Sequence, residues 1–192
     1  MPQSDHEIID TIRKGNPHNY ALLVHRYKDK GMTLALRMLR NREEAEEVLQ
    51  DAFVRAYNGL EKFRGMAKFG TWFYRILYNA CLTRLEKNKN SIVSLSAGDD
   101  FDDAMISDGG EPELIDALDK KELVHQVKEI LEHLPEIYGA LLTMFYLQEL
   151  SYEEIAGVTQ MPLGTVKVRL FRGRAMLQER LTREASAMRS AR

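Results

Sequence analysis

The residues between 162 and 177 combine two patterns that suit contact with duplex DNA. Small and apolar residues recur at spacings of 4, 3 and 4, which places them on one buried face of a helix: Val166, Leu170, Gly173 and Leu177. The opposite face carries Thr165, Val168, Arg169 and Arg172. Arg169 and Arg172 are placed to enter a major groove and donate to guanine edges, while Lys167 and Arg174 on the flanks can reach phosphates.

A short helix and a tight turn precede this cationic helix. Ser151 and Glu154 have the spacing of a capping box, in which the two side chains bind each other's backbone amides. The turn at residues 160–161 is followed by Pro162, which suits the start of a second helix. The order predicts a helix-turn-helix. A charged helix alone is usually only a solvated face, but the three features together favour DNA binding.

A second candidate site, at residues 63–79, interleaves aromatic and basic side chains. Its aromatic residues are Phe63, Phe69, Trp72, Phe73, Tyr74 and Tyr78, and its cations are Arg64, Lys68 and Arg75. Unpaired bases stack on aromatic rings while cations neutralise phosphates, so the composition suits single-stranded nucleic acid. We expect most of these aromatic residues to lie in the core, and residues 63–70, which include two glycines, to form a loop or a broken helix.

The net charge of −2 conceals an uneven distribution of charge. Residues 1–90 hold 16 Lys and Arg against 11 Asp and Glu, residues 91–134 hold 3 against 12, and residues 135–192 hold 8 against 6. Two basic regions therefore flank an acidic middle, and the small total does not exclude a nucleic-acid partner.

Helical spacing and capping signals predict an all-α chain. Helix starts are indicated at Ser4, at Asn16 with Pro17, at Asn41 and at Thr71, and in the second half near residues 117, 136, 151 and 162. Residues 91–116 are rich in Ser, Gly and Asp and predict a linker between two small helical domains. We interpret the acidic charge of this linker as a feature that keeps it solvated. The alternative is that the linker mimics nucleic acid and binds in a basic channel of a partner.

Several classes of site are disfavoured. Cys81 is the single cysteine, so an intrachain disulfide or a cysteine-based zinc cluster cannot form, and we expect a buried thiol. The five histidines show no metal motif, and neither a phosphate-binding glycine loop nor a nucleophile elbow is present. We therefore expect no cofactor, no metal and no enzyme activity. The start of the chain lacks a secretory pattern and no apolar run could span a bilayer, which predicts a cytoplasmic protein.

A set of motifs, taken in order, resembles a known family. The first half contains EEAEEVLQDAF at residues 43–53, FRG at 63–65, FGTWFYRI at 69–76 and NA at 79–80. The second half contains LP at 134–135, LSYEEIA at 150–156 and PLGTVKVR at 162–169. These motifs resemble regions 2 and 4 of the extracytoplasmic-function sigma factors of bacterial RNA polymerase.

The resemblance implies region 2 within residues 1–90, a linker at 91–116, region 4 within 117–185 and a tail at 186–192. It implies contact with the clamp helices of the largest polymerase subunit by Glu43, Glu46, Glu47, Gln50 and Asp51. It implies capture of a flipped −10 base by Phe63, Arg64, Met66, Ala67, Lys68, Phe69, Trp72, Arg75 and Asn79. It implies −35 contacts by Lys167, Val168, Arg169, Phe171 and Arg172, which helix geometry extends to Thr165 and Arg174.

The resemblance also implies partners: core RNA polymerase, including its flap, promoter DNA, and an anti-sigma factor of the kind that is often anchored in a membrane. No small-molecule substrate is implied. The sequence departs from the family pattern at three places: at Glu47, in the loop at Met66 and Ala67, and at Val168. Val168 replaces a small polar residue, and its methyl groups suit a thymine methyl, which predicts a shifted preference at one −35 base. The alternative is a stand-alone helix-turn-helix regulator with residues 1–90 as a sensor or dimerisation domain.

Overall fold

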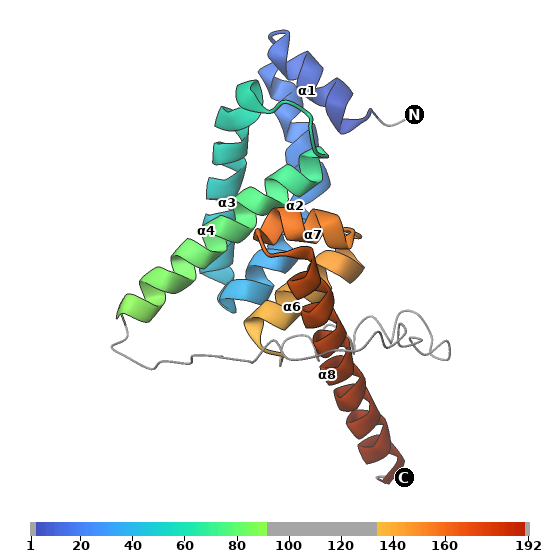
Figure 1. Cartoon of the computed structure of the whole chain (residues 1–192). Coiled ribbons are helices and arrows are strands. Elements are labelled where there is room, and N and C mark those ends of the chain that lie inside the picture. The colour runs from blue at the N-terminus through green and yellow to red at the C-terminus, as the bar shows by residue number, and fades with distance from the viewer. Residues whose placement is uncertain (1–2, 92–133, 191–192) are drawn as a thin grey trace.

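The computed structural model describes residues 3–91 and 134–190, and every regular element in these ranges is helical (Figure 1). The first half contains α1 (Asp5–Arg13), a 3-10 turn (Pro17–Asn19), α2 (Tyr20–Leu39), α3 (Arg42–Gly59), a second 3-10 turn (Leu60–Lys62) and α4 (Phe69–Ser91). The second half contains α6 (Glu136–Leu142), a π-helical turn (Thr143–Leu147), α7 (Tyr152–Thr159) and α8 (Leu163–Ser190). The all-α prediction is confirmed. The predicted linker at 91–116 and most of the predicted helix at 117–134 lie outside the described residues.

Three predicted helix starts are confirmed by their caps. Ser4 and Glu7 form the capping box of α1, and Ser151 and Glu154 form that of α7. The Asn41 side chain accepts from the Glu44 amide at 3.1 Å and caps α3. These side chains satisfy amides that the first helical turn leaves unpaired, which is why the sequence pattern located the starts correctly.

α6 begins at Glu136 as predicted, whereas three other boundaries differ from prediction by a few residues. The Asn16 side chain makes no capping hydrogen bond; its backbone oxygen accepts from the Asn19 amide at 3.2 Å and closes a 3-10 turn ahead of α2. α4 begins at Phe69, two residues before the predicted Thr71. α8 continues to Ser190, through residue 185 where the sequence predicts the end of a domain.

In the first half, α2, α3 and α4 enclose a core of aliphatic and aromatic side chains. Leu23, Leu34, Ala52, Phe73 and Leu77 are fully buried there. The rings of Phe53 and Phe73 stack with centroids 4.5 Å apart. Aromatic stacking adds about 0.5–1.5 kcal/mol to the burial of area. The expectation that most aromatics of residues 63–79 belong to the core is confirmed, since four of the six are buried: Phe69, Phe73, Tyr74 and Tyr78.

The two halves pack against each other, α6 on α2 and α7 on α4 (Figure 1). The guanidinium groups of Arg37 and Arg40 donate to the Leu134 carbonyl at 3.1 and 2.9 Å. The Gln148 amide donates to the Lys30 carbonyl at 3.2 Å. The buried side chains of the two halves form one continuous hydrophobic core. α8 extends beyond this body towards the C-terminus.

Gly139 lies close to the Arg37 side chain where α6 meets α2, and the closeness of this contact can be tested. A Cβ on Gly139 would overlap the Arg37 guanidinium, whereas a Cβ on Gly157 of α7 meets nothing within 4 Å. We expect Gly139→Ala to displace Arg37, lower the thermal midpoint and increase the radius of gyration in small-angle scattering. Gly157→Ala, the matched control, should raise stability by up to about 1 kcal/mol through helix propensity. An unchanged radius and midpoint for Gly139→Ala would contradict the close packing.

Candidate nucleic-acid and partner interfaces

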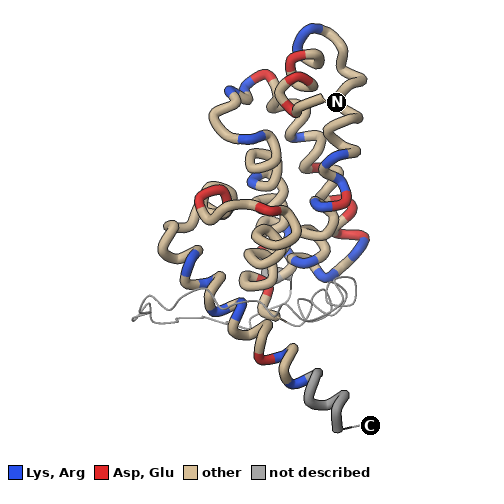
Figure 2. Tube along the Cα trace, turned by 90° about the vertical axis from the view of Figure 1, so that its right-hand side faces the viewer, with Lys and Arg blue, Asp and Glu red and all other residues tan. Residues whose placement is uncertain are grey.

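The cationic helix α8 has the two faces that the sequence predicts. Val166, Leu170 and Leu177 are buried, and Gly173 packs against Leu142. The opposite side is exposed at Lys167 and partly exposed at Thr165, Val168, Arg169, Phe171 and Arg172. Figure 2 shows Lys and Arg recurring along α8, with acidic positions on α7 beside it. The structure therefore brings six of the seven predicted −35 residues onto one side of a single helix.

Arg174, the seventh, has a different environment from the one expected. Its guanidinium lies over the Phe145 ring, 4.8 Å from the centroid, and donates to the Tyr152 hydroxyl at 2.9 Å. Tyr146 is also within cation–π range. These aromatic side chains come from the π-helical turn and α7, so Arg174 joins α8 to the helix that braces it. Helix spacing alone placed Arg174 on a flank; the contact depends on aromatics more than 20 residues away and was not predicted.

The aromatic and basic segment forms an exposed loop, residues 63–68, between Leu60–Lys62 and α4. Arg64, Met66, Ala67 and Lys68 are exposed, and Met66 is 91% exposed. Gly65 has φ +70°, a conformation that side-chain-bearing residues rarely adopt. The turn at this position of the loop therefore depends on a residue without a side chain.

Of the remaining predicted −10 residues, some lie in the core and others on the surface. Phe69 is 2% exposed and belongs to the core. Phe63 and Trp72 are partly exposed and pack with centroids 4.9 Å apart. Arg75 and Asn79 are exposed one turn apart on the outer side of α4. A base or phosphate can therefore meet the loop, the edge of the Phe63 and Trp72 pair, and this outer stripe, but not Phe69.

The second half covers part of this surface. Glu154 of α7 pairs with Lys68 at 3.1 Å and accepts from the Thr71 hydroxyl at 3.2 Å. Gln160, with its amide oxygen turned towards α4, accepts from Arg75 Nε at 3.2 Å. A cleft of about 730 Å³ remains between the halves, with Tyr74, Gln148 and Glu154 in its lining. In this arrangement two of the predicted −10 cations are engaged by the second half.

The charge of Glu154 is maintained despite its partial burial. Burial alone would raise the pKa of Glu154, but the Ser151 amide and the Lys68 ammonium group stabilise the carboxylate and hold its pKa below the ordinary value of 4.5. The ion pair with Lys68 therefore persists at neutral pH. Its contribution to docking is present above the ordinary pKa and is lost as the pH falls through the lowered one.

The predicted partner surface lies on α3. Glu43, Glu46, Glu47, Gln50 and Asp51 are all exposed. Glu47 accepts from Arg84 at 2.9 Å and so ties α3 to α4, and Glu46 pairs with Arg42 on its own helix at 2.9 Å. Within the described part of the chain, no side-chain hydrogen bond or ion pair is recorded for Glu43, Gln50 or Asp51, which leaves them available to a partner.

An apolar groove beside this acidic face was not predicted from the sequence. It has a volume of about 700 Å³ between α2 and α3, and its lining includes Tyr20, Val24, Gln50, Val54 and Tyr57. Val54 and Tyr57 are 54% and 41% exposed. Their spacing from Gln50, four and seven residues, was the available signal. Exposed apolar side chains gathered in a groove mark an interaction surface.

Three further observations limit the chemistry. Cys81 is buried, as predicted, and burial raises the pKa of its thiol to about 12, so the thiol stays protonated. Within residues 3–91 and 134–190, no group of three or more His, Cys, Asp or Glu side chains could hold a metal ion. None of the helices in the described ranges has the length and apolar character needed to cross a membrane.

Sequence comparison gives a consistent result for both halves. The family models for Sigma-70 region 2 and Sigma-70 region 4 match residues 23–91 and 125–177. The ECF RNA polymerase sigma factor SigW of Bacillus subtilis is 36% identical over 178 residues, which cover 90% of this chain and 94% of that protein. The RNA polymerase sigma-H factor of Pseudomonas aeruginosa is 33% identical over 184 residues, covering 93% and 94%.

Solved structures show the same fold. CnrH, in complex with the cytosolic domain of CnrY, superposes with a TM-score of 0.64 at 20% identity and covers 94% of this chain and 98% of that chain. The sigma factor RpoE of Bartonella quintana, in complex with the anti-sigma factor NepR, superposes with a TM-score of 0.63 at 22% identity, covering 85% and 97%. The two-part helical architecture is confirmed.

The environment of Arg174 predicts that it stabilises the helix-turn-helix. Arg174→Lys keeps the charge but loses the planar stack on Phe145 and the hydrogen bond to Tyr152, so we expect a loss of about 1 kcal/mol in the free energy of unfolding. Arg172→Lys is the matched control and should leave stability unchanged. Urea unfolding of the two variants measures this difference. Equal stabilities would show that the aromatic contacts contribute nothing.

The lowered pKa of Glu154 predicts that docking weakens in acid. As the pH falls below 4.5, protonation removes the charge opposite Lys68, and the two halves should separate more easily. Glu154→Gln keeps a helix-capping side chain but has no charge to lose, so its radius of gyration should depend less on pH over that range. Small-angle scattering of both proteins between pH 6 and pH 3 tests this. Parallel curves would assign the acid effect to other groups.

Proposed function

Because the chain belongs to the extracytoplasmic-function subfamily of sigma-70 factors, we propose that it is an alternative sigma factor, which binds core RNA polymerase and directs initiation at specific promoters. The observation that carries the proposal is the presence, in one chain and in the family's order, of an exposed aromatic and basic loop on a helical bundle and a cationic helix-turn-helix. Each half supplies a surface suited to a different form of DNA. The loop suits an unpaired strand, and α8 suits a duplex groove.

In region 4, α8 acts as the recognition helix for the −35 element. Arg169 and Arg172 donate to guanine edges, and Lys167 neutralises a phosphate. Val168 contacts a thymine methyl, so a thymine is the favoured base at its position. Arg174 supports this helix from behind through its aromatic contacts, and its effect on DNA binding is indirect.

In region 2, the loop at residues 63–68 captures a base that has left the −10 duplex. Extruding a base costs a few kcal/mol of stacking and pairing, which contacts in the loop must offset. The partly exposed pair of Phe63 and Trp72 offers an aromatic edge beside the loop. Arg64 and Lys68 bind phosphates of the captured strand. Arg75 and Asn79 extend the contact with DNA along α4.

Promoter capture competes with the docked arrangement. Glu154 pairs with Lys68 and accepts from Thr71, and Gln160 faces Arg75, so DNA phosphates that bind these cations must replace their contacts to the second half. The ion pair is partly solvent-exposed, and pairs of this kind are worth about 1 kcal/mol or less. Binding to polymerase and to DNA phosphates can therefore replace it.

Core polymerase binds the α2 and α3 surface. The acidic and amide side chains Glu43, Gln50 and Asp51 face the basic side of a coiled coil of the largest subunit, while the apolar groove with Val54 and Tyr57 receives its aliphatic side chains. An anti-sigma factor is the proposed inhibitor, and it competes for this same groove. The proposed place of action is the cytoplasm, where polymerase and promoter DNA are found.

The alternative of a stand-alone helix-turn-helix regulator is not favoured, because both halves of the chain match sigma-factor regions. Sigma factors are not enzymes, and an absence of catalytic activity in this chain is part of the proposal. The domain limits of 1–90 for region 2 and 117–185 for region 4 are likewise proposed.

Reconstitution with sigma-free core polymerase tests the function. A promoter is first selected from a library randomised at the −10 and −35 elements, and specific transcripts are then measured. We expect the wild-type chain to support initiation. Asp51→Lys should bind core more weakly, while Arg172→Ala should bind core normally and lose about 1–3 kcal/mol of −35 recognition, or about five- to 150-fold in affinity.

Lys14→Gln, a charge change at a residue outside both proposed surfaces, serves as the control. A chain that bound duplex sites tightly alone, yet neither joined core nor gave specific transcripts, would refute the sigma-factor proposal. Weak duplex binding by the isolated chain would not, because free members of this family usually bind promoters poorly.

A further inference from the structure

We propose that α1 positions the −10 loop, through Arg13 at one end of the loop and Asp5 at the other. The inference rests on the proposed function, since base capture by residues 63–68 is part of that proposal. α1 precedes residue 23, where the match to region 2 begins, so the family comparison assigns it no role. Arg13 and Asp5 are positioning residues, which act on DNA through the loop.

Arg13 fixes the point at which the chain leaves its helix and enters the loop. Its Nη2 donates to the Leu60 carbonyl at 2.7 Å and also to the Phe63 carbonyl. The Leu60 carbonyl also accepts from the Phe63 amide at 3.2 Å, which closes the 3-10 turn. A guanidinium that binds the carbonyls of Leu60 and Phe63 makes charge-assisted hydrogen bonds, which are stronger than those of a neutral donor. The direction of the loop is therefore set by a residue 47 positions before Leu60.

The backbone of Phe63 is also tied to the aromatic side of the loop. The Phe63 amide donates to the Gly59 carbonyl at 3.1 Å. Its ring packs on Trp72 at 4.9 Å and on Phe69 at 6.1 Å. Because Arg13 holds the Phe63 carbonyl, it also limits where this ring, and hence its edge beside the loop, can lie.

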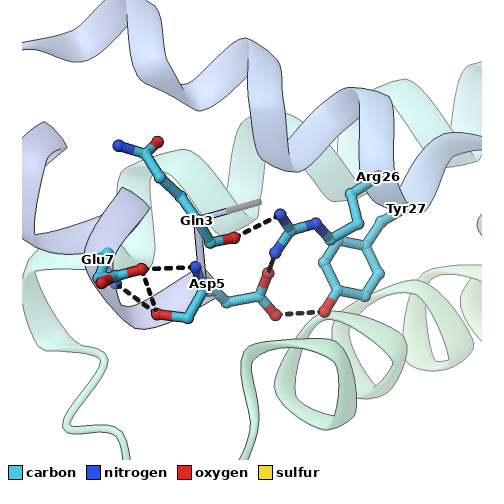
Figure 3. Close-up of polar contacts among 6 residues, drawn as sticks. Gln3, Asp5, Glu7, Arg26 and Tyr27 are labelled. Atoms are coloured by element: carbon cyan, nitrogen blue, oxygen red, sulfur yellow. Dashed lines mark hydrogen bonds and ion pairs between the residues drawn. The ribbon is translucent and has the colours of Figure 1, made fainter. Parts of the chain in front are cut away.

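Asp5 acts at the other end of the loop, through Tyr27. The Asp5 carboxylate lies between α2 and α4 and accepts from the Tyr27 hydroxyl and from Arg26, whose second nitrogen donates to the Gln3 carbonyl at 2.7 Å (Figure 3). The Tyr27 ring packs on Phe69 at 5.3 Å. A Cβ on Gly70 would lie 2.9 Å from the ring of Tyr27. Tyr27 therefore supports the first turn of α4, directly after the loop.

The hydroxyl of Tyr27 is a permanent donor. Burial and the hydrogen bond to Asp5 raise the pKa of Tyr27 well above its ordinary value, so the phenol stays protonated at working pH. The contact with Asp5 is thus a fixed support and does not respond to pH in the neutral range.

α1 is rigid enough to transmit both contacts. A capping box fixes its first turn, and Ile8 and Ile9 are 1% and 3% exposed in the core. Arg13 and Asp5 are eight residues apart, which corresponds to about 12 Å along a helix axis. One short helix therefore braces both ends of a loop that is itself exposed.

The structural arm of the test uses Arg13→Gln and Lys14→Gln. Both variants remove one positive charge from the same end of α1. Of the two side chains, only that of Arg13 forms hydrogen bonds at the start of the loop. Trp72 is the single tryptophan of the chain and touches Phe63, so its fluorescence reports on the loop. We expect Arg13→Gln to move the emission to longer wavelength and increase acrylamide quenching at unchanged helical circular dichroism. Lys14→Gln should behave as wild type.

The functional arm uses holoenzyme and single-stranded non-template −10 DNA from the selected promoter, either intact or abasic at one position. Wild-type holoenzyme should prefer intact DNA at the captured base. We expect Arg13→Gln to lower that preference by about tenfold, the scale of one lost charge-assisted hydrogen bond, with unchanged affinity for core and for −35 duplex. Arg13→Lys, which keeps a charged donor, should recover part of the preference.

Tyr27→Phe removes only the hydroxyl that Asp5 accepts, and it decides the question if Arg13→Gln loses helical signal. We expect a reduced preference for intact DNA with normal core binding. If folded Arg13→Gln and Tyr27→Phe both keep the wild-type preference and the wild-type Trp72 emission, the inference is wrong and the sigma-factor proposal stands. If wild-type holoenzyme gives no specific transcripts, the sigma-factor proposal fails, and with it the role of α1 in base capture.

Discussion

The burial of the first half of α4, residues 69–81, on almost every side is the constraint on which the structure depends. Phe69, Phe73 and Leu77 face the core made with α2 and α3, and Tyr74 and Tyr78 are buried as well. Tyr74 lines the cleft to the second half, and the charge of Arg169 on α8 acts on Tyr78. Within residues 69–81 only Arg75 and Asn79 are exposed. A helix enclosed in this way holds the first half together and also provides the seat for α7.

This enclosure connects folding to promoter capture. If the halves separate, the side of α4 that carries Tyr74 and Tyr78 gains solvent beside the exposed stripe. Among the described residues, none forms a hydrogen bond with the buried Tyr74 hydroxyl. Separation of the halves would let this hydroxyl bind water.

The features that could be predicted from the sequence are those determined within a few residues. The capping boxes at Ser4 and Ser151 and the buried face of α8 follow from side chains three or four positions apart. Features that join distant segments could not be predicted. Arg174 has the spacing of a phosphate ligand, yet aromatic residues from two other elements surround it. The groove at Val54 and Tyr57 exists because α2 supplies its other wall.

The same distinction applies to the two DNA-facing surfaces. The duplex-facing side of α8 is specified by one helix, because the helical repeat alone sets which side chains point outward. The loop at residues 63–68 has no such internal repeat, and its residues 64–68 are exposed and lie outside the core. Its geometry must come from its ends, and those ends are held by Arg13 and by Tyr27 with Asp5. The proposed selection of a base by this loop would therefore depend on α1, a helix outside the loop itself.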